Sequence, residues 1–164
     1  MSRLALLLVF MLVELSVADN SWCSTEDGFF FLSGQCFKYF HDEPETGHVN
    51  ISKAFCEDNG LTLAHPHDVI GLRSYLLQKY GYAACWLNAQ RFDDNTYFTW
   101  LDNNAKLGED SPYWCGNHPT TERDCVILLV KNDWANKCPT QPLHSMKCDS
   151  PSNLKFRTLC EKVN

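Results

Sequence analysis

The sequence lacks any long apolar segment beyond its first residues. Its only marked apolar run, Leu4–Val13, follows Arg3 and is about half as long as a helix that crosses a bilayer. Ser16 and Ala18 supply the small residues that signal peptidase accepts. We therefore predict a signal peptide at 1–18, a secreted, extracellular mature protein, and no membrane anchor.

A surplus of basic residues is also lacking. The formal net charge is -6, whereas binding to nucleic acid or to an anionic membrane needs a basic face. Internal repeats and low-complexity tracts are absent too, so residues 19–164 are expected to form one domain. These absences exclude nucleic acid and membrane surfaces as partners and leave neutral ligands open.

A catalytic constellation is the third absence. The only suggestive pair, His65 and His67, is separated by Pro66 at the expected start of a helix, which is typical of a turn. No nucleophile and base, and no metal-ligand motif, stand at a spacing that implies a defined geometry. The sequence predicts that the protein is not an enzyme.

Cysteine, in contrast, is abundant. All nine cysteines lie in the mature part, and in an oxidising compartment this density predicts a disulfide framework. The odd count leaves one thiol that is free or paired with another chain. The sequon Asn50-Ile51-Ser52 adds a candidate glycosylation site at Asn50.

Periodicity predicts two helices and several strands. Residues 50–60 and 67–81 carry apolar residues on one helical face, with Asp68 able to cap the second helix, and with Gly60 and Gly81 as stops. A hairpin is expected around Ser33-Gly34, since aromatic runs flank that pair. Further strands are expected at 85–90, 125–130, 133–138 and 157–161.

Between the strands at 85–90 and 125–130 lies a connection, residues 91–124, that is far longer than an ordinary loop. It is rich in Asp, Asn, Gly and Pro, yet it also contains four aromatic residues: Tyr97, Phe98, Trp100 and Trp114. Loops of this length are usually functional or disordered, and the aromatic residues favour a packed, functional one.

The order of these segments resembles a known family, the C-type lectin-like domain in its long form with an N-terminal hairpin disulfide. The resemblance covers nearly the whole mature chain and rests on Cys23, Cys36 and the following segments: AFC at 54–56, LTLAH at 61–65, CWLNAQ at 85–90, FTWLD at 98–102, PYWCGNHP at 112–119, RDCVIL at 123–128, DWANKC at 133–138 and LCE at 159–161. It implies an α+β fold of two helices and two small antiparallel sheets, in which the long loop binds the ligand.

The resemblance also implies three disulfides, namely Cys23–Cys36, Cys56–Cys160 and Cys125–Cys138. Cys85, Cys115 and Cys148 are then left over, and three interpretations stay open. In the first, the three cysteines form one more internal bridge and leave one buried free thiol. In the second, Cys115 pairs with Cys148 and Cys85 is the unpaired residue. In the third, an exposed Cys115 forms a disulfide with a second chain.

Sugar-binding members of the family hold calcium with a Glu-Pro-Asn or Gln-Pro-Asp triplet, a later Glu, and a Trp-Asn-Asp run on the neighbouring strand. The matching triplet here is His118-Pro119-Thr120, in which only the proline, held cis in the family, is kept. The later acid aligns with Arg123, or with Glu122 if the shortened loop slides by one residue, and the run aligns with Trp134-Ala135-Asn136.

This ligand set predicts a weak calcium site or none. Calcium prefers about six to eight hard oxygen ligands that include several carboxylates, and Glu122 and Asn136 are the only side chains proposed here as metal ligands. Asp93, Asp94 and Asp124 suggest a second calcium site of some relatives, but Arg91 stands where those relatives carry an acid. We interpret these three acids as solvated loop residues.

Two functions follow from the resemblance. The leading hypothesis is a secreted lectin that recognises glycans on microbial or other cell surfaces in innate immunity, using Trp114, Asn117, His118, Pro119, Thr120, Glu122 and Asn136. In it, Trp114, Tyr113 or Trp100 stacks on the sugar ring. The alternative is a calcium-independent protein-binding domain, either monomeric or linked as a dimer through Cys115; binding to ice or mineral surfaces is a third, more distant reading.

Overall fold

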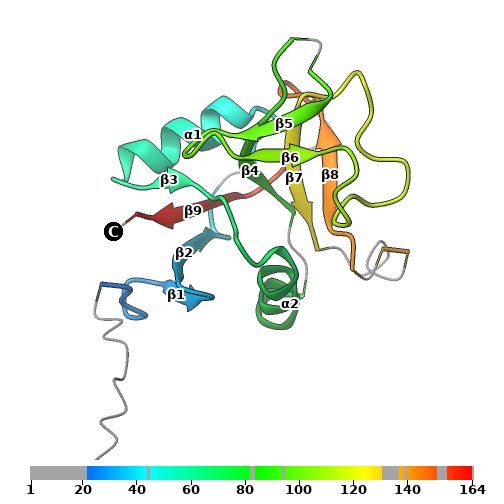
Figure 1. The fold of residues 1–164 in the computed structure, drawn as a ribbon. Helices are drawn as coiled ribbons and strands as arrows, with labels where there is room; N and C mark the ends of the chain where they lie inside the picture. Colours follow the sequence, from blue (N-terminus) through cyan, green and yellow to red (C-terminus); the bar gives the residue numbers. More distant parts are fainter. Residues whose placement is uncertain are drawn as a thin grey trace, which may run out of the picture.

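The computed structural model describes residues 22–43, 45–81, 84–93, 95–130, 137–138, 140–150 and 155–163. These residues form two helices and two antiparallel sheets, as the resemblance implies (Figure 1). The predicted signal peptide and its cleavage point lie outside the described residues. Neither described helix has the length and apolar character needed to cross a membrane.

Both helices begin and end close to where the sequence predicts. Helix α1 spans Val49–Asp58 and ends before Gly60, which has a φ of +69°. Helix α2 spans Val69–Tyr80, and the Asp68 carboxylate accepts a hydrogen bond from the Gly71 amide at 2.8 Å, which satisfies one of the unpaired donors of the first turn. Gly81 closes α2 in the left-handed conformation.

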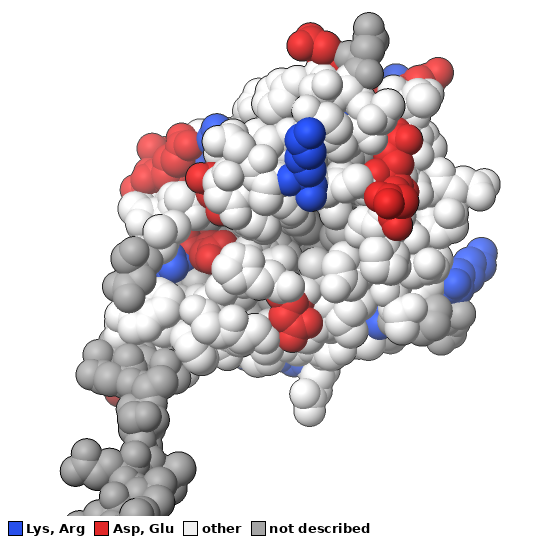
Figure 2. Space-filling model, in the orientation of Figure 1, with Lys and Arg blue, Asp and Glu red and all other residues white. Residues whose placement is uncertain are grey.

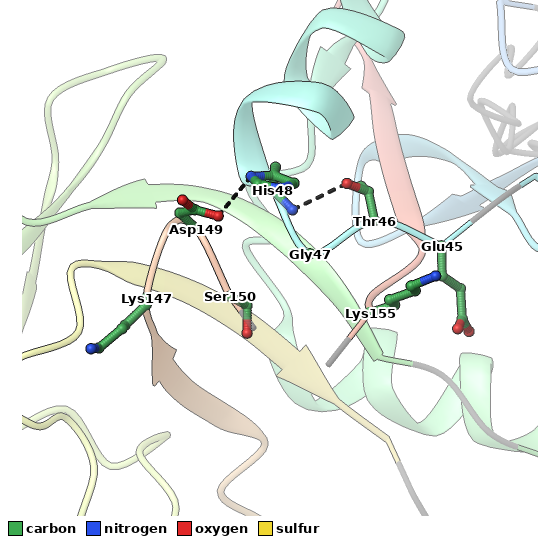
Figure 3. A pocket seen from close by; sticks show the side chains of 8 residues that line it. All are labelled: Glu45, Thr46, Gly47, His48, Lys147, Asp149, Ser150 and Lys155. Carbon is green, nitrogen blue, oxygen red and sulfur yellow. Dashed lines mark hydrogen bonds and ion pairs between the residues drawn. The ribbon is translucent and has the colours of Figure 1, made fainter. Parts of the chain in front are cut away.

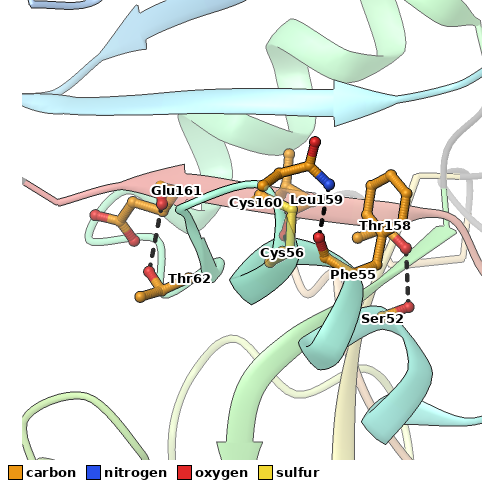
Figure 4. The surroundings of a disulfide bond; sticks show 9 residues. Ser52, Phe55, Cys56, Thr62, Thr158, Leu159, Cys160 and Glu161 are labelled. Carbon is orange, nitrogen blue, oxygen red and sulfur yellow. Dashed lines mark hydrogen bonds between the residues drawn. A yellow bond between two sulfur atoms is a disulfide. The ribbon is translucent and has the colours of Figure 1, made fainter.

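The first sheet holds the two ends of the domain together. Its strand order is β1-β2-β9-β3, with β1 at Phe29–Leu32, β2 at Gln35–Phe40, β9 at Thr158–Lys162 and β3 at Thr62–Leu63. The β1–β2 hairpin turns at Ser33-Gly34 as predicted. The predicted bridges Cys23–Cys36 and Cys56–Cys160 are both present, and the second joins α1 to β9 beside a hydrogen bond between Ser52 and Thr158 (Figure 4).

The second sheet carries the long loop. Its strand order is β6-β5-β4-β7-β8, with β6 at Lys106–Gly108, β5 at Tyr97–Trp100, β4 at Ala84–Gln90, β7 at Cys125–Leu129 and β8 at Leu143–Met146. Strands β4 and β7 match the prediction, whereas β5 and β6 form a hairpin inside the connection that the sequence treats as loop. The remaining stretch, 109–124, runs along the side of the sheet where β7 and β8 lie (Figure 1).

The strand beside β7 is not the one that the sequence suggests. The DWANKC stretch was expected to pair there, but its residues 133–136 lie outside the described residues. The pairing strand is β8, in a register that sets Cys125 opposite Met146 and Leu128 opposite Leu143. Leu143 is completely buried, so its burial favours this strand as the partner of β7.

This register corrects the disulfide assignment. Cys148 lies two residues beyond Met146, so it reaches Cys125, and the predicted Cys125–Cys138 bridge is wrong. Cys138 pairs with Cys115 instead. The amide of Cys115 donates a hydrogen bond to the Leu143 carbonyl at 3.0 Å. Neither a Cys115–Cys148 bridge nor a Cys115-linked dimer is compatible with these pairs. Cys85 is the single unpaired cysteine of the described chain, and burial raises the pKa of its thiol.

We predict that proteolytic mapping of the unreduced mature protein recovers peptides that join Cys115 to Cys138 and Cys125 to Cys148. Cys85 should react with a thiol reagent only after denaturation, because it is fully buried and the thiolate is the reactive form. A peptide that joins Cys125 to Cys138, or a thiol that reacts in the native protein, would contradict the β7–β8 register.

Candidate functional site

The triplet His118-Pro119-Thr120 lies against strand β8, where Ser145 holds it in place. His118 Nδ1 is 3.0 Å from Ser145 Oγ and accepts the Ser145 amide at 3.1 Å, and the Thr120 amide donates to Ser145 Oγ at 3.0 Å. The His118–Pro119 peptide bond is cis, as the resemblance implies. One buried serine therefore fixes both residues that flank the proline.

Two imidazoles and a guanidinium share this spot. The rings of His118 and His144 meet edge to face with centroids 4.5 Å apart, and Arg123 Nη1 lies 3.5 Å from the Ser145 carbonyl oxygen. Burial, together with the neighbouring His118 and Arg123, lowers the pKa of His144 to about 4. Burial and the charge of Arg123 lower the pKa of His118 as well. Both rings are therefore neutral near pH 7, and His118 carries its proton on Nε2 because Nδ1 accepts a hydrogen bond.

The other predicted ligand-binding residues are divided between the surface and the interior. Asn117 and Glu122 are exposed on the loop beside the triplet. Trp114 is only 4% exposed, donates from Nε1 to the Gly108 carbonyl at 2.8 Å and packs on Phe98, so it supports the loop from below. Asn136 lies outside the described residues.

Sequence reasoning missed His144 and Ser145. They stand four and three residues before Cys148, in the strand Leu143–Met146. Treating Cys148 rather than Cys138 as the partner of Cys125 would have pointed to them, because the partner of Cys125 follows the strand that pairs with β7.

Arg91 ties the long loop to the end of β4. Its side chain is 4% exposed, and it donates to the Asp124 carboxylate at 3.1 Å, to the Thr120 carbonyl at 2.6 Å and to the Arg123 carbonyl at 3.1 Å. A fourth contact, at 3.4 Å, reaches the carboxylate of Glu109. The expectation that Asp124 is only a solvated loop acid is therefore wrong, while Asp94 lies outside the described residues.

The described residues do not fit calcium, the ion that sugar-binding members of the resembled family hold at this triplet. The groups that meet at the triplet are an imidazole nitrogen, a serine hydroxyl and a guanidinium, none of which is the carboxylate oxygen that calcium prefers. The side-chain oxygen of Thr120 is buried without a hydrogen-bond partner, but it is a single neutral atom. The carboxylates of Asp124 and Glu109 already face Arg91, and no cluster of three or more potential metal-ligating side chains exists in the described parts of the chain.

The His65-Pro66-His67 segment serves a structural role. The His65 ring is buried, stacks on Trp100 with centroids 4.0 Å apart and lies 2.8 Å from the carboxylate of Asp102. These contacts connect the segment before α2 to the end of β5. Trp100, 6% exposed, is not available to stack on a ligand.

Other surface features of the described residues were compared with the triplet. Acidic and basic side chains are interspersed on the face in Figure 2, where the described residues form no continuous basic patch. An open hollow of about 580 Å³ lies between the segment that precedes α1 and the residues after β8 (Figure 3). Its two carboxylates are already paired, Glu45 with Arg157 at 3.1 Å and Asp149 with His48 at 2.8 Å. The triplet remains the better candidate, since its polar groups are fixed by a buried serine.

No protein-family profile matches the sequence, and no curated protein matches it either. Solved structures do resemble it. The C-type carbohydrate-recognition domain of cow CD23, determined in the presence of a GlcNAc2Man3 oligosaccharide, is 16% identical with a TM-score of 0.61, and the match covers 84% of this chain and 95% of that one. The C-type lectin domain of murine dendritic cell inhibitory receptor 2, in complex with an N-glycan, is 14% identical with a TM-score of 0.62, over 84% and 97% of the two chains.

A calcium-independent type II antifreeze protein is similar to the same degree. It is 17% identical, with a TM-score of 0.58 over 83% of this chain and 92% of that one. At such identities the likeness concerns the fold, and it agrees with the two helices, the two antiparallel sheets and the bridges described above. The described chain therefore has the fold of a C-type lectin-like domain.

Proposed function

We propose that the protein is a secreted glycan-recognition domain that works without calcium. The observation that carries the proposal is the network in which Ser145 fixes His118 and Thr120 at the surface of the long loop. Two solved structures of the same fold support the ligand class, since one was determined in complex with an N-glycan and the other in the presence of an oligosaccharide. Recognition of microbial or other cell surfaces in innate immunity is the role that we propose for it.

The site binds a sugar through hydrogen bonds. Nε2 of His118 is a donor of fixed direction, because Ser145 holds the opposite side of the ring. Asn117 and Glu122 are exposed next to it and offer an amide and a carboxylate to neighbouring hydroxyl groups. Stacking on Trp114 or Trp100 has no part in this binding, since both are buried.

Secretion fits the chemistry of the chain. Eight of the nine cysteines form disulfides in the described structure, and such bonds persist in oxidising compartments. Asn50 is exposed in the first turn of α1, so its sequon is accessible for glycosylation. Together with the apolar N-terminal run, these features support the proposal of export.

A glycan array probed with the refolded mature protein tests the proposal. Binding should be the same in EDTA and in millimolar calcium. His118→Ala and Ser145→Ala should each weaken glycan binding by about tenfold or more. The first variant removes a ligand contact, and the second removes the hydroxyl that hydrogen-bonds His118 and Thr120. Glu57→Ala, an exposed change on α1, is the matched control and should bind like the wild type. Arrays that stay blank under both conditions exclude glycan recognition.

One observation favours the protein-binding alternative. Phe92, directly after Arg91 at the base of the long loop, is 44% exposed, and exposed aromatic residues are enriched where proteins bind partners. Because Cys115 is used inside the chain, this alternative no longer includes a dimer linked through that residue. If arrays are blank, loss of binding to a candidate protein in Phe92→Ser would support it.

Acid should destabilise the protein through the two imidazoles. The folded pKa of His144, about 4, lies below its ordinary value of 6.5, so the unfolded chain binds more protons between these values. The free energy of unfolding should therefore fall as pH decreases through this window. In His144→Gln, the free energy of unfolding measured with urea should lose about 3 kcal/mol of its pH dependence between pH 6.5 and pH 4. An unchanged pH dependence in the variant would show that the ring is not held neutral.

A further inference from the structure

The guanidinium of Arg91 occupies a cage of oxygens. Two carboxylates, from Asp124 and Glu109, and two backbone carbonyls, from Thr120 and Arg123, receive its N–H groups. These are hard oxygen ligands of the kinds that calcium accepts in proteins. The four oxygens therefore form a cation site, and the cation that fills it is the guanidinium of Arg91.

The charges are consistent with this reading. Arg91 brings one positive charge to two carboxylates whose side chains are about half exposed, 50% for Asp124 and 46% for Glu109, while its own side chain is 4% exposed. The guanidinium also lies over the ring of Phe98, with Cζ 5.0 Å from the centroid. A buried positive charge needs such partners, because unpaired it would be strongly destabilising.

The position of Arg91 joins the cage to the proposed binding site. Arg91 follows β4 directly, and its amide donates to the Asp124 carbonyl at 2.8 Å, which places the guanidinium under the loop. A single guanidinium nitrogen, Nη2, donates hydrogen bonds to the carbonyl oxygens of both Thr120 and Arg123. Thr120 is the last residue of the triplet, so the cation sets the position of the segment that presents His118.

We propose that Arg91 is a positioning residue that takes the place of a structural metal ion, so that the loop 109–124 is ordered without calcium. Removing the side chain leaves two carboxylates and two carbonyls around a cavity with a net charge of about -2, which a calcium ion would neutralise. The variant should therefore become calcium-dependent where the wild type is not. The link from Arg91 to glycan binding rests on the proposed function, whereas the calcium dependence of stability does not.

The test is thermal unfolding of the mature protein in EDTA and in millimolar calcium. The Tm of the wild type should be the same in both. Arg91→Ala should lower the Tm in EDTA by roughly 10 °C, because it leaves the two carboxylates without their buried partner. Calcium should then raise the Tm of the variant by about 4 °C.

Arg157→Ala is the matched control. Arg157 also pairs with a carboxylate, that of Glu45 at 3.1 Å, but it lies on the segment that leads into β9, and its hydrogen bonds and ion pair among the described residues reach Glu43, Glu45, Ala84 and Trp86 rather than the long loop. This variant should lose stability and gain nothing from calcium. A calcium-insensitive Arg91→Ala, or an equal rescue of Arg157→Ala, would overturn the proposal.

If Arg91→Ala does not fold in EDTA, its refolding yield with and without calcium becomes the readout. Recovery only with calcium supports the cage. If it refolds under neither condition, Arg91→Gln decides, because its amide keeps some of the hydrogen bonds but removes the positive charge. Its Tm should lie below that of the wild type and rise with calcium, and a calcium-insensitive Tm overturns the proposal.

Glycan binding gives the second readout. Arg91→Ala should bind glycan weakly in EDTA and recover with calcium, whereas His118→Ala should stay weak in both. If stability responds to calcium but no glycan binds to any variant, the cage stands and the proposed function fails. If the wild type binds glycan but Arg91→Ala ignores calcium, the proposed function stands and the cage fails.

Discussion

The pairing of one buried guanidinium with four oxygens is the interaction on which the binding region depends. Arg91 stands at the end of β4 and draws the backbone of Thr120, Arg123 and Asp124 down onto the sheet. Ordering the backbone of such a loop costs about 1–2 kcal/mol per residue. Buried Trp114 and the Cys115–Cys138 bridge offset part of that cost, and the guanidinium adds several fixed donors at the point where the loop returns to the sheet.

Around this point, three further constraints hold the triplet at the surface. The register of β7 and β8 brings Ser145 opposite Val126 and against His118. The Cys115–Cys138 bridge attaches the middle of the PYWCGNHP segment to the connection between these strands. Trp114 fills the space below, with its indole N–H satisfied by Gly108. The triplet thus has polar groups of defined direction and lies on a rigid support, as a binding site for a hydroxyl-rich ligand requires.

The sequence predicts much of the fold because its signals are local or belong to a specific order of motifs. Asp68 and Gly81 mark the ends of α2, and the family resemblance implies two bridges that the structure contains, Cys23–Cys36 and Cys56–Cys160. The partner strand of β7 is different. Two segments that end in a cysteine, DWANKC at 133–138 and LHSMKC at 143–148, are both candidates for the strand beside β7. Local sequence does not distinguish them, and the choice depends on tertiary pairing. The error in strand choice leads to the wrong partner for Cys125 and hides His144 and Ser145, since both follow from the same register. Arg91 stands out in the sequence because it replaces an acid of the resembled family. Its hydrogen-bond partners lie 18 to 33 residues away in the sequence, so local patterns do not predict them.

If Arg91 orders the long loop in place of a metal ion, calcium should leave the loop unchanged. Amide hydrogen exchange of residues 109–124 in the wild-type protein, compared in EDTA and in millimolar calcium, is the decisive measurement, because protection reports the local free energy of opening. We expect the same protection of this segment under both conditions. Protection that rises with calcium, confined to these residues, would contradict it and would place a metal ion where Arg91 is now assigned.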